Sequence, residues 1–356
     1  MGFDMKKRVT IAEIAKKCNT SIGTVDRALN NRSGIHSETK EFILQTAREM
    51  GYQTNPIAGA LSRKKSIRLG VVYCENHADF YDYVTRGIEQ AAKELQIYGV
   101  EVIQWKTFNL SGEEQLELLE SIDVSECDGF AINSAGTQTD TILNRIVELG
   151  IPVLTFNTDA PTTKRFCYIG ANARRAGNLA GELIGKIMGQ EGKVAALGSF
   201  LATNSFVERF IGFYEVIQRE YPKIMLCPFS ECFNDTQSAY QETLRIVKEN
   251  TDVKALYITG SAGTVGAIEA IKELGRKDII LVGYDITQPT IQALKDGWCT
   301  AILYQDPYFQ GYQAVKVLAK HVLEGFEPRT PLLTVDTKIM MKYNLEECEN
   351  TALFLS

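Results

Sequence analysis

The sequence is poor in the residues that build metal centres and disulfide frameworks. It contains three histidines and eight cysteines among 356 residues, and no two cysteines form a C-x-x-C pair. Scattered thiols of this kind usually pack as small apolar side chains. We therefore expect neither a structural metal nor a bound cofactor.

Long apolar segments are also missing. No stretch approaches the roughly 20 apolar residues that a membrane-spanning helix needs. The first ten residues, MGFDMKKRVT, lack the apolar core of a secretory signal. Hydrophobic residues make up 45% of the chain and charged residues 23%, as in ordinary globular proteins. We expect a cytoplasmic protein that is long enough for two or three compact domains.

Positive charge is concentrated near the N-terminus. Residues 1–65 contain 12 Lys and Arg against 6 Asp and Glu, a net charge of +6, whereas the remaining residues carry −12. A basic region joined to an acidic one suits a module that neutralises DNA phosphates, tethered to a module that does not. The charge distribution favours double-stranded DNA as one partner.

The sequence changes character near residue 63. Residues 10–50 read as three short helices, whereas residues 67–340 alternate apolar runs with longer amphipathic stretches. This alternation predicts doubly wound parallel sheets with helices on both faces, arranged as two similar lobes with a cleft between them. The predicted strands are Leu69–Tyr73, Val100–Trp105, Gly129–Asn133, Val153–Asn157, Lys193–Gly198, Ala255–Thr259, Ile279–Tyr284 and Thr300–Tyr304.

Polar side chains stand at the ends of four predicted strands, namely Asn133, Asn157, Asp285 and Gln305. Ligands of open α/β sheets bind outside the carboxyl ends of the strands. Any one of these residues can equally serve as a helix cap or a turn residue. Four of them together favour a ligand-binding cleft.

The N-terminal region predicts two helices, Ile11–Lys17 and a second one ending at about Leu29, joined by a short turn. Ser21 is a suitable N-cap for the second helix, and Asn19 tolerates a left-handed backbone at the turn. A third helix is predicted over Glu38–Met50. This is helix-turn-helix geometry, although a small helical bundle without a nucleic-acid partner shows the same spacing.

The segment VTIAEIAKKCNTSIGTVDRALNN closely resembles the N-terminal domain of the LacI/GalR family, whose pattern is roughly V-T-I-x-x-[IV]-A-x-x-[AC]-G-[VT]-S-x-x-T-V-S-R-x-L-N. Residues 51–61, GYQTNPIAGAL, are similar to the family's hinge, G-Y-x-P-N-x-x-A-x-x-L. The resemblance implies a hinge that orders on DNA, where Leu61 of each subunit wedges into the minor groove. A flexible linker is the alternative for this segment.

The same resemblance implies an operator-contacting surface. In it, Ser21, Thr24 and Asn30 face phosphates, and Ile22, Gly23 and Arg27 face bases. Gly23 removes a side chain where the family often has a base reader, and Asp26 stands where serine is usual, so the operator sequence stays open. The complete predicted DNA-binding set is Thr10, Ser21, Ile22, Gly23, Thr24, Arg27, Asn30, Asn55, Ala58 and Leu61.

From Leu69 to about Lys342 the chain resembles the periplasmic binding protein type 1 fold, nearer to its ribose-binding branch than to the lactose repressor. The resemblance rests on segments such as DGFAINSAG, GIPVLTFNTD and IILVGYDITQPTIQALKDG. It implies an effector site formed by Phe80, Tyr81, Asn133, Asn157, Arg209, Phe233, Asp285 and Gln305.

These residue types suit a sugar, because aromatic rings stack on sugar rings while Asp285 accepts and Arg209 donates hydrogen bonds. The pair Asn157-Thr158 replaces the usual Asp-Arg pair of ribose sites, and Gly260 stands where asparagine is common. Ribose itself is therefore doubtful. A bulkier polyol, a sugar acid and another sugar derivative all stay open.

An NAD-dependent enzyme is the main alternative from another class. The segment GSAGTVG at residues 260–266 follows a strand and opens a helix, as a dinucleotide-binding fingerprint does. However, Ala262 occupies the place of the second glycine, and no catalytic constellation accompanies the segment. A transport receptor would require export, and a regulator with a protein partner would leave the polar strand ends without a role.

The sequence therefore predicts an all-α helix-turn-helix domain over residues 8–53, a hinge helix and linker over 54–66, and a two-lobed α/β body over 67–350. Lobe 1 is expected over about 67–170 and 305–331, and lobe 2 over about 171–304 and 332–350. The predicted function is a homodimeric transcription regulator, most simply a repressor and not an enzyme. It binds a pseudo-palindromic operator under the control of a small sugar-like effector.

Overall fold

The computed structural model describes residues 9–29, 33–50, 52, 66–75, 79–108, 111–198, 203–233 and 235–345. The chain divides into two compact units, Met1–Lys65 and Ser66–Ser356, which are called the head and the body below. None of the helices within the described ranges is both long enough and apolar enough to cross a membrane.

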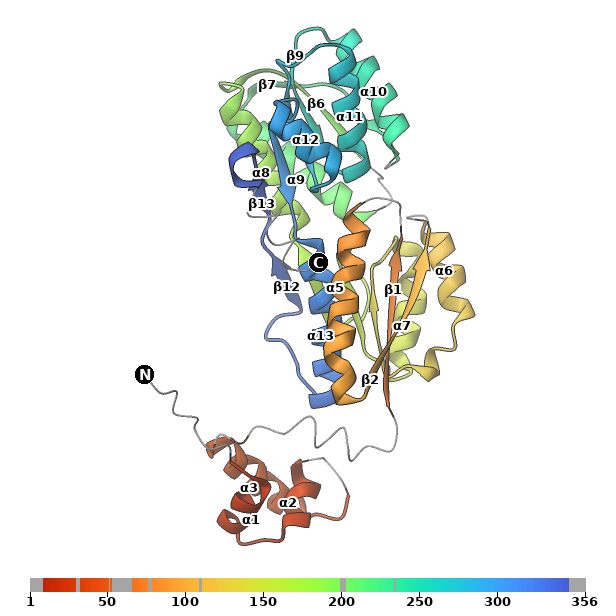
Figure 1. The fold of residues 1–356 in the computed structure, drawn as a ribbon, viewed down its shortest axis with the longest axis vertical. Coiled ribbons are helices and arrows are strands. Elements are labelled where there is room, and N and C mark those ends of the chain that lie inside the picture. Colours follow the sequence, from red (N-terminus) through yellow and green to blue (C-terminus); the bar gives the residue numbers. More distant parts are fainter. Residues whose placement is uncertain are drawn as a thin grey trace. The chain divides into compact units, whose positions relative to one another are not determined.

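The head contains three helices around a small apolar core: α1 (Ile11–Lys17), α2 (Ile22–Leu29) and α3 (Ser37–Glu49). These bounds confirm the predicted helix-turn-helix pair and the third helix (Figure 1). At the turn between α1 and α2, Asn19 has a left-handed backbone with φ of 50°. The core that joins the helices is made by Ile14, Ala15, Val25, Ala28, Ile43 and Ala47.

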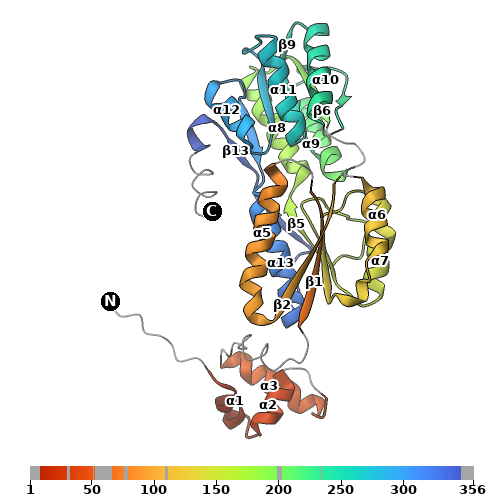
Figure 2. The same cartoon turned by 45° about the vertical axis from the view of Figure 1, so that its right-hand side comes forward.

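The first part of the body, lobe 1, contains the strands β1 (Ile67–Cys74), β2 (Val100–Thr107), β3 (Gly129–Ile132), β4 (Val153–Phe156), β5 (Cys167–Ala171) and β12 (Leu332–Val335). Its helices are α5 (Asp79–Leu95), α6 (Gly112–Ser121), α7 (Asp140–Glu148) and α13 (Pro307–Glu324). The strands are all parallel, in the order β2-β1-β3-β4-β5-β12. α5 and α13 lie side by side on one face, and α6 and α7 cover the other (Figures 1 and 2).

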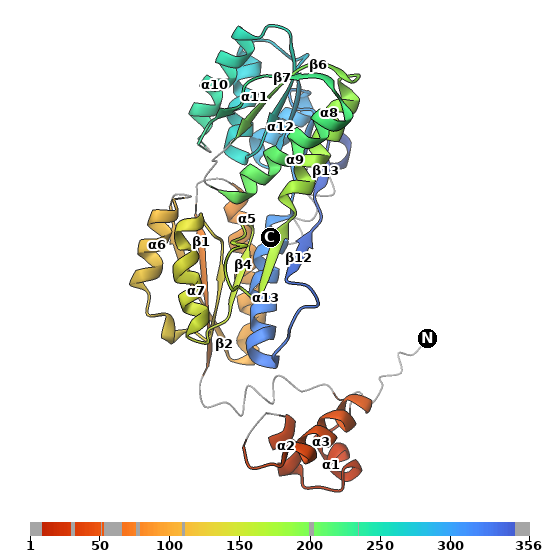
Figure 3. The same cartoon turned by 180° about the vertical axis from the view of Figure 1, so that it is seen from behind.

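The second part, lobe 2, contains β6 (Glu191–Gly198), β7 (Lys223–Leu226), β8 (Ser230–Glu231), β9 (Val253–Ile258), β10 (Ile280–Tyr284), β11 (Ala301–Tyr304) and β13 (Lys338–Met340). Its helices are α8 (Ala173–Ile187), α9 (Asn204–Glu220), α10 (Thr236–Glu249), α11 (Ser261–Glu273) and α12 (Gln288–Asp296). The strand order is β7-β6-β9-β10-β11-β13, β8 also pairs with β6, and β13 alone runs antiparallel to its neighbour. α8 and α9 pack together on one face (Figure 3).

All eight predicted strands are present, with ends that differ by no more than two residues. The strands that the sequence did not predict are β5, β7, β8, β12 and β13. Most of them are short and lie at sheet edges. A half-exposed edge strand has little of the buried apolar character that marks a strand in sequence.

The structure differs from the prediction at one lobe boundary. Leu332–Val335 pairs with β5 in lobe 1, whereas the sequence assigned residues 332–350 to lobe 2. Its side chains alternate between exposed and half-buried. The sequence of such a segment does not predict which of the two sheets it joins, because that depends on the strand with which its backbone pairs.

Close contacts between helices depend on glycine. A Cβ atom on Gly177 of α8 would lie 2.0 Å from the carbonyl oxygen of Arg209 in α9, and one on Gly87 of α5 would lie 2.1 Å from that of Tyr308 in α13. Any larger residue would force these helices apart. Gly177 therefore helps to fix the position of the backbone that carries Arg209.

Candidate functional site

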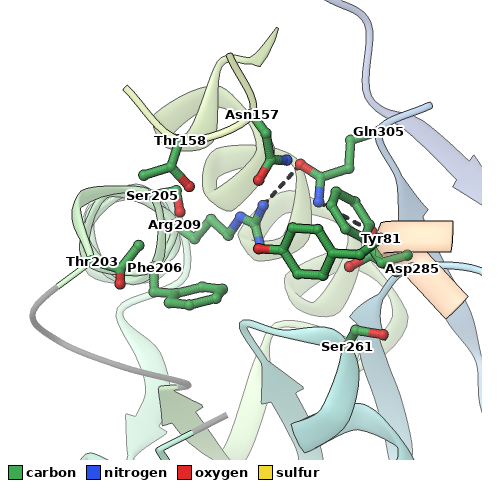
Figure 4. A pocket seen from close by; sticks show the side chains of 11 residues that line it. Tyr81, Asn157, Thr158, Thr203, Ser205, Phe206, Arg209, Ser261, Asp285 and Gln305 are labelled. Atoms are coloured by element: carbon green, nitrogen blue, oxygen red, sulfur yellow. Dashed lines mark hydrogen bonds between the residues drawn. The ribbon is translucent and has the colours of Figure 1, made fainter. Parts of the chain in front are cut away.

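A cavity of about 450 Å³, partly open to solvent, is lined by residues of both lobes. Figure 4 shows side chains from α5, from the end of β4, from the first turns of α9 and α11, and from the ends of β10 and β11. The lining residues are Phe80, Tyr81, Asn157, Thr158, Thr203, Ser205, Phe206, Arg209, Ser261, Asp285 and Gln305.

Arg209, Gln305 and Asp285 form a hydrogen-bonded chain at the cavity wall. Arg209 Nη2 donates to Gln305 Oε1 at 2.8 Å, and Gln305 Nε2 donates to Asp285 Oδ1 at 3.1 Å (Figure 4). All three side chains are buried. Because the amide lies between a cation and an anion, its oxygen faces the guanidinium and its amino group faces the carboxylate.

Asp285 follows β10 directly and adopts a left-handed backbone with φ of 67°. Burial raises the pKa of Asp285 to about 6, while the charge of Arg209 and the hydrogen bond from Gln305 act in the opposite direction. Among the described residues, Gln305 is the only one whose side chain donates a hydrogen bond to this carboxylate, which leaves it room for further donors. Hydroxyl groups of a bound molecule are suited to supply them.

The Arg209 guanidinium is held by aromatic rings as well as by oxygen atoms. Its central carbon lies 4.0 Å from the ring centroid of Tyr284 and 5.4 Å from that of Phe206. Its Nη1 donates to the carbonyl oxygen of Thr259 at 2.7 Å. Behind it, the hydroxyls of Tyr257 and Tyr284 are 3.2 Å apart, and burial raises the pKa of both. The cation therefore rests on neutral aromatic rings.

Asn157 occupies the lobe 1 side of the cavity and is held by three neighbours. Its Oδ1 accepts from Asn133 Nδ2 at 3.1 Å, its Nδ2 donates to Gln310 Oε1 at 3.3 Å, and its carbonyl oxygen accepts from the Tyr168 hydroxyl at 2.9 Å. Gln310 Nε2 in turn donates to the Gln305 carbonyl oxygen at 2.6 Å. Buried Gln310 thus connects the two sides of the site.

The predicted effector residues fall into three groups. Those that line the cavity are Phe80, Tyr81, Asn157, Arg209, Asp285 and Gln305. Asn133 lies behind the wall and contacts Asn157. Phe233 does not line the cavity, and 62% of its surface is exposed.

The cavity residues that sequence reasoning missed are Thr158, Thr203, Ser205, Phe206 and Ser261. Four of them stand at the start of α9 or α11, because the amino ends of these helices face the same sheet edge as the strand ends. The sequence does contain small polar residues at the start of each of these helices. Such residues are common as helix caps, so their presence does not by itself predict contact with a ligand.

The glycine-rich segment at residues 260–266 has a packing role in the structure. A Cβ atom on Gly266 would lie 2.2 Å from the Thr236 carbonyl oxygen in α10. Close contact between α10 and α11 therefore accounts for this glycine, without a bound dinucleotide.

In the head, α2 presents its predicted base-reading residues at the surface. Ile22 is 58% exposed, and Gly23 and Arg27 are exposed beside it. Arg27 Nε donates to the Gly23 carbonyl oxygen at 3.1 Å, and the hydroxyls of Ser21 and Thr24 are 2.8 Å apart. Ser21, Ile22 and Arg27 are thus exposed at the same end of the head, with Thr24 half-buried between them.

Thr10 caps α1. Its hydroxyl accepts from the Glu13 N–H at 3.3 Å, and its own N–H donates to Glu13 Oε2 at 2.7 Å. The predicted DNA-binding residues Asn30, Asn55, Ala58 and Leu61, and almost all of the predicted hinge over 54–66, lie outside the described residues.

Two family models match the chain. Residues 10–55 match bacterial regulatory proteins of the lacI family, and residues 69–325 match the periplasmic binding protein domain. The probable HTH-type transcriptional repressor ExuR of Bacillus subtilis is 26% identical over 282 residues, covering 78% of this chain and 81% of that protein. The ribose operon repressor of Halalkalibacterium halodurans is 22% identical over 287 residues, covering 78% and 80%.

Solved structures give the same fold for the body. GanP, a glucose-galactose binding protein from Geobacillus stearothermophilus, is 28% identical with a TM-score of 0.72 and covers 79% of this chain and 99% of its own. AraP, an arabinose binding protein from the same organism, is 26% identical with a TM-score of 0.67 and covers the same shares.

The fold and the site therefore define a DNA-binding regulator with a sensor body built like a sugar-binding protein. The chain belongs to the periplasmic binding protein domain family and carries a lacI-family helix-turn-helix domain on the N-terminal side of that domain in the sequence.

Proposed function

We propose that two copies of this chain bind a pseudo-palindromic operator as a repressor, and that a sugar or sugar derivative in the cavity controls this binding. The observation that carries the proposal is the combination, in one chain, of an exposed α2 face with a polar cavity lined by two lobes. Such a regulator works in the cytoplasm, where the chromosome lies, and it acts by binding and not as an enzyme.

On the operator, α2 enters the major groove. Arg27 leaves the Gly23 carbonyl oxygen and donates its fork to a guanine, while Ile22 contacts a thymine methyl group. The hydroxyls of Ser21 and Thr24 donate to phosphates. In the proposal, Thr10, Gly23, Asn30, Asn55, Ala58 and Leu61 complete the interface.

In the body, the effector binds between the lobes and stabilises one lobe arrangement over another. A ligand shifts such an equilibrium only by its difference in affinity for the two arrangements. The proposed contacts on lobe 1 are Phe80, Tyr81 and Asn157, positioned by Asn133. The proposed contacts on lobe 2 are Arg209, Asp285 and Gln305. Phe233 is a further candidate, which would reach the effector if the two lobes move closer together.

The experiment is selection of preferred DNA sites by the full chain, followed by fluorescence anisotropy on the selected duplex. Arg27→Ala should weaken binding by about 1–3 kcal/mol and relax the preference at one base pair. Arg48→Ala is the matched control, because Arg48 is also exposed, on α3, and its Nε likewise donates to a carbonyl oxygen four residues back, that of Leu44. It should leave the preferred sequence unchanged.

Two results would count against the proposal. If the full chain showed no sequence preference, the proposal that it binds a specific operator would be wrong. If Arg27→Ala kept the wild-type preference, the proposal that Arg27 contacts a base would be wrong. Binding should also fall steeply as salt increases, because phosphate contacts release counterions.

A further inference from the structure

The two helices of lobe 2 that begin at the cavity are not capped by their own side chains. The N-cap residues Thr203 of α9 and Gly260 of α11 make no side-chain capping hydrogen bond. The other helices of the lobe, α8, α10 and α12, are capped by Asn172, Asp235 and Thr287. First-turn N–H groups need acceptors and favour negative charge. At α9 and α11 the cavity is the place from which an acceptor can come.

Thr203 provides a second and independent observation. Its side chain is 1% exposed and lines the cavity, yet its Oγ1 has no hydrogen-bond partner within the described part of the chain. A buried hydroxyl without a partner is costly, so such groups are usually satisfied. An oxygen atom of a bound molecule would satisfy it.

Arg209 lies on the same side of the cavity. It lies four positions after Ser205, so both project from one face of α9 (Figure 4). Its guanidinium is buried, and within the ranges the structure describes it makes no ion pair. Its Nη atoms donate to the neutral oxygens of Thr259 and Gln305, and its Nε is buried without a partner. Buried charges in proteins are normally paired.

We propose that the effector carries a carboxylate, which binds at the amino end of α9 against Thr203, Ser205 and Arg209, while its hydroxyl groups face Asp285. The proposal rests on the proposed function and narrows the effector to a sugar acid. The two ends of the cavity differ in charge, because the Asp285 carboxylate would repel a second carboxylate, whereas the α9 end offers hydroxyl and N–H donors and the positive charge of Arg209. A ligand with an anionic end therefore fits in one orientation.

The test compares each acid with its neutral counterpart on the full chain by isothermal titration calorimetry. D-Galacturonate is paired with D-galactose, and D-glucuronate with D-glucose. D-Glucose 6-phosphate tests whether a phosphate serves as the anion. At least one acid should bind ten-fold or more tightly than its neutral counterpart, since a hydrogen bond to a charged group contributes more than one to a neutral group.

Thr203→Val removes the hydroxyl and keeps the shape of the side chain. This variant should lose about ten-fold in affinity for the acid while its affinity for the neutral sugar changes less than two-fold. Thr107→Val is the matched control, because the Thr107 hydroxyl is also buried without a partner but does not line the cavity. It should leave both affinities unchanged.

Several outcomes overturn the proposal. They are equal or tighter binding of the neutral sugars, binding of none of these compounds, or an acid preference that survives in Thr203→Val. A preference for D-glucose 6-phosphate alone would also overturn the assignment of a carboxylate. If the ligand were a neutral sugar, the carboxylate proposal would be wrong but the proposed function as a regulator would stand. If the chain showed no sequence-selective DNA binding, the proposed function would be wrong, whichever ligand binds in the cavity.

Discussion

The two lobes contribute different chemistry to one cavity. Lobe 2 supplies the charged groups, Arg209 and Asp285, whereas the described wall from lobe 1 is made of amide, hydroxyl and aromatic side chains such as Asn157 and Tyr81. The lobes have similar sheets, so the difference arises at the strand and helix ends and not in the architecture. Charged contacts give large energies that depend on geometry, while neutral contacts select shape. We expect lobe 2 to dominate affinity and lobe 1 to dominate selectivity.

The largest effect is expected from Arg209→Gln. The change removes the cation and the donor to Thr259, so effector affinity should fall by about 100-fold or more in calorimetric titrations. Arg245→Gln is the control, because Arg245 makes its ion pairs with Glu242 and Glu249 on the outer surface of α10. A smaller loss in Arg209→Gln than in Asn157→Ala would reverse the ranking of the two lobes.

Asp285→Asn should change stability in a manner that depends on pH. Burial raises the pKa of Asp285 to about 6, so between about pH 4 and pH 6 the folded protein binds more protons than the unfolded chain. Stability of the wild-type protein therefore falls as pH rises through this window. Above it, the neutral asparagine should make the ligand-free protein more stable by on the order of 1–3 kcal/mol.

Denaturant unfolding of both proteins at pH 4, 6 and 7.5 measures this difference. It should be near zero at pH 4 and greatest at pH 7.5. The variant should also lose effector affinity, since an amide has one acceptor oxygen in place of two. A difference in stability that does not vary with pH would mean that the carboxylate is not strained by burial.

The smallest effect is expected at Gln310, which touches neither charged group. Gln310→Leu leaves the Gln305 carbonyl oxygen and the Asn157 amide without their partners, so effector affinity should fall about ten-fold. Gln310→Glu keeps the acceptor for Asn157 and loses the donor to Gln305, and it should lie between wild type and Gln310→Leu. Equal affinities in all three proteins would show that the two sides of the cavity act independently.

The sequence was sufficient for features that depend on neighbouring residues. The helix-turn-helix follows from apolar spacing in α1 and α2, from Ser21 at the N-cap and from Asn19 at the turn. Short, mostly apolar strands such as β3 and β4 were predictable because they are buried along their whole length, although β5, which is equally buried, was missed. The polar residues after β4 and β10 also predicted the cavity, because the carboxyl ends of parallel strands meet at one edge of a sheet.

Other features depend on residues far apart in the chain. Phe206 and Ser261 resemble ordinary helix-start residues until α9 and α11 bring them to one wall. Leu332–Val335 joins the lobe 1 sheet because its backbone pairs with β5. Its alternating exposed and half-buried residues do not favour either sheet.

The sequence by itself determined the three helices of the head, eight of the strands of the body and six of the residues that line the cavity. Only the tertiary structure decided that Arg209 reaches Gln305, 96 residues away, and makes no ion pair among the described residues. It also decided that the hydroxyl of Thr203 is buried without a partner in that part of the chain. The physical reason is that periodicity and capping act over a few residues, whereas burial and hydrogen-bond satisfaction depend on which distant groups packing brings together.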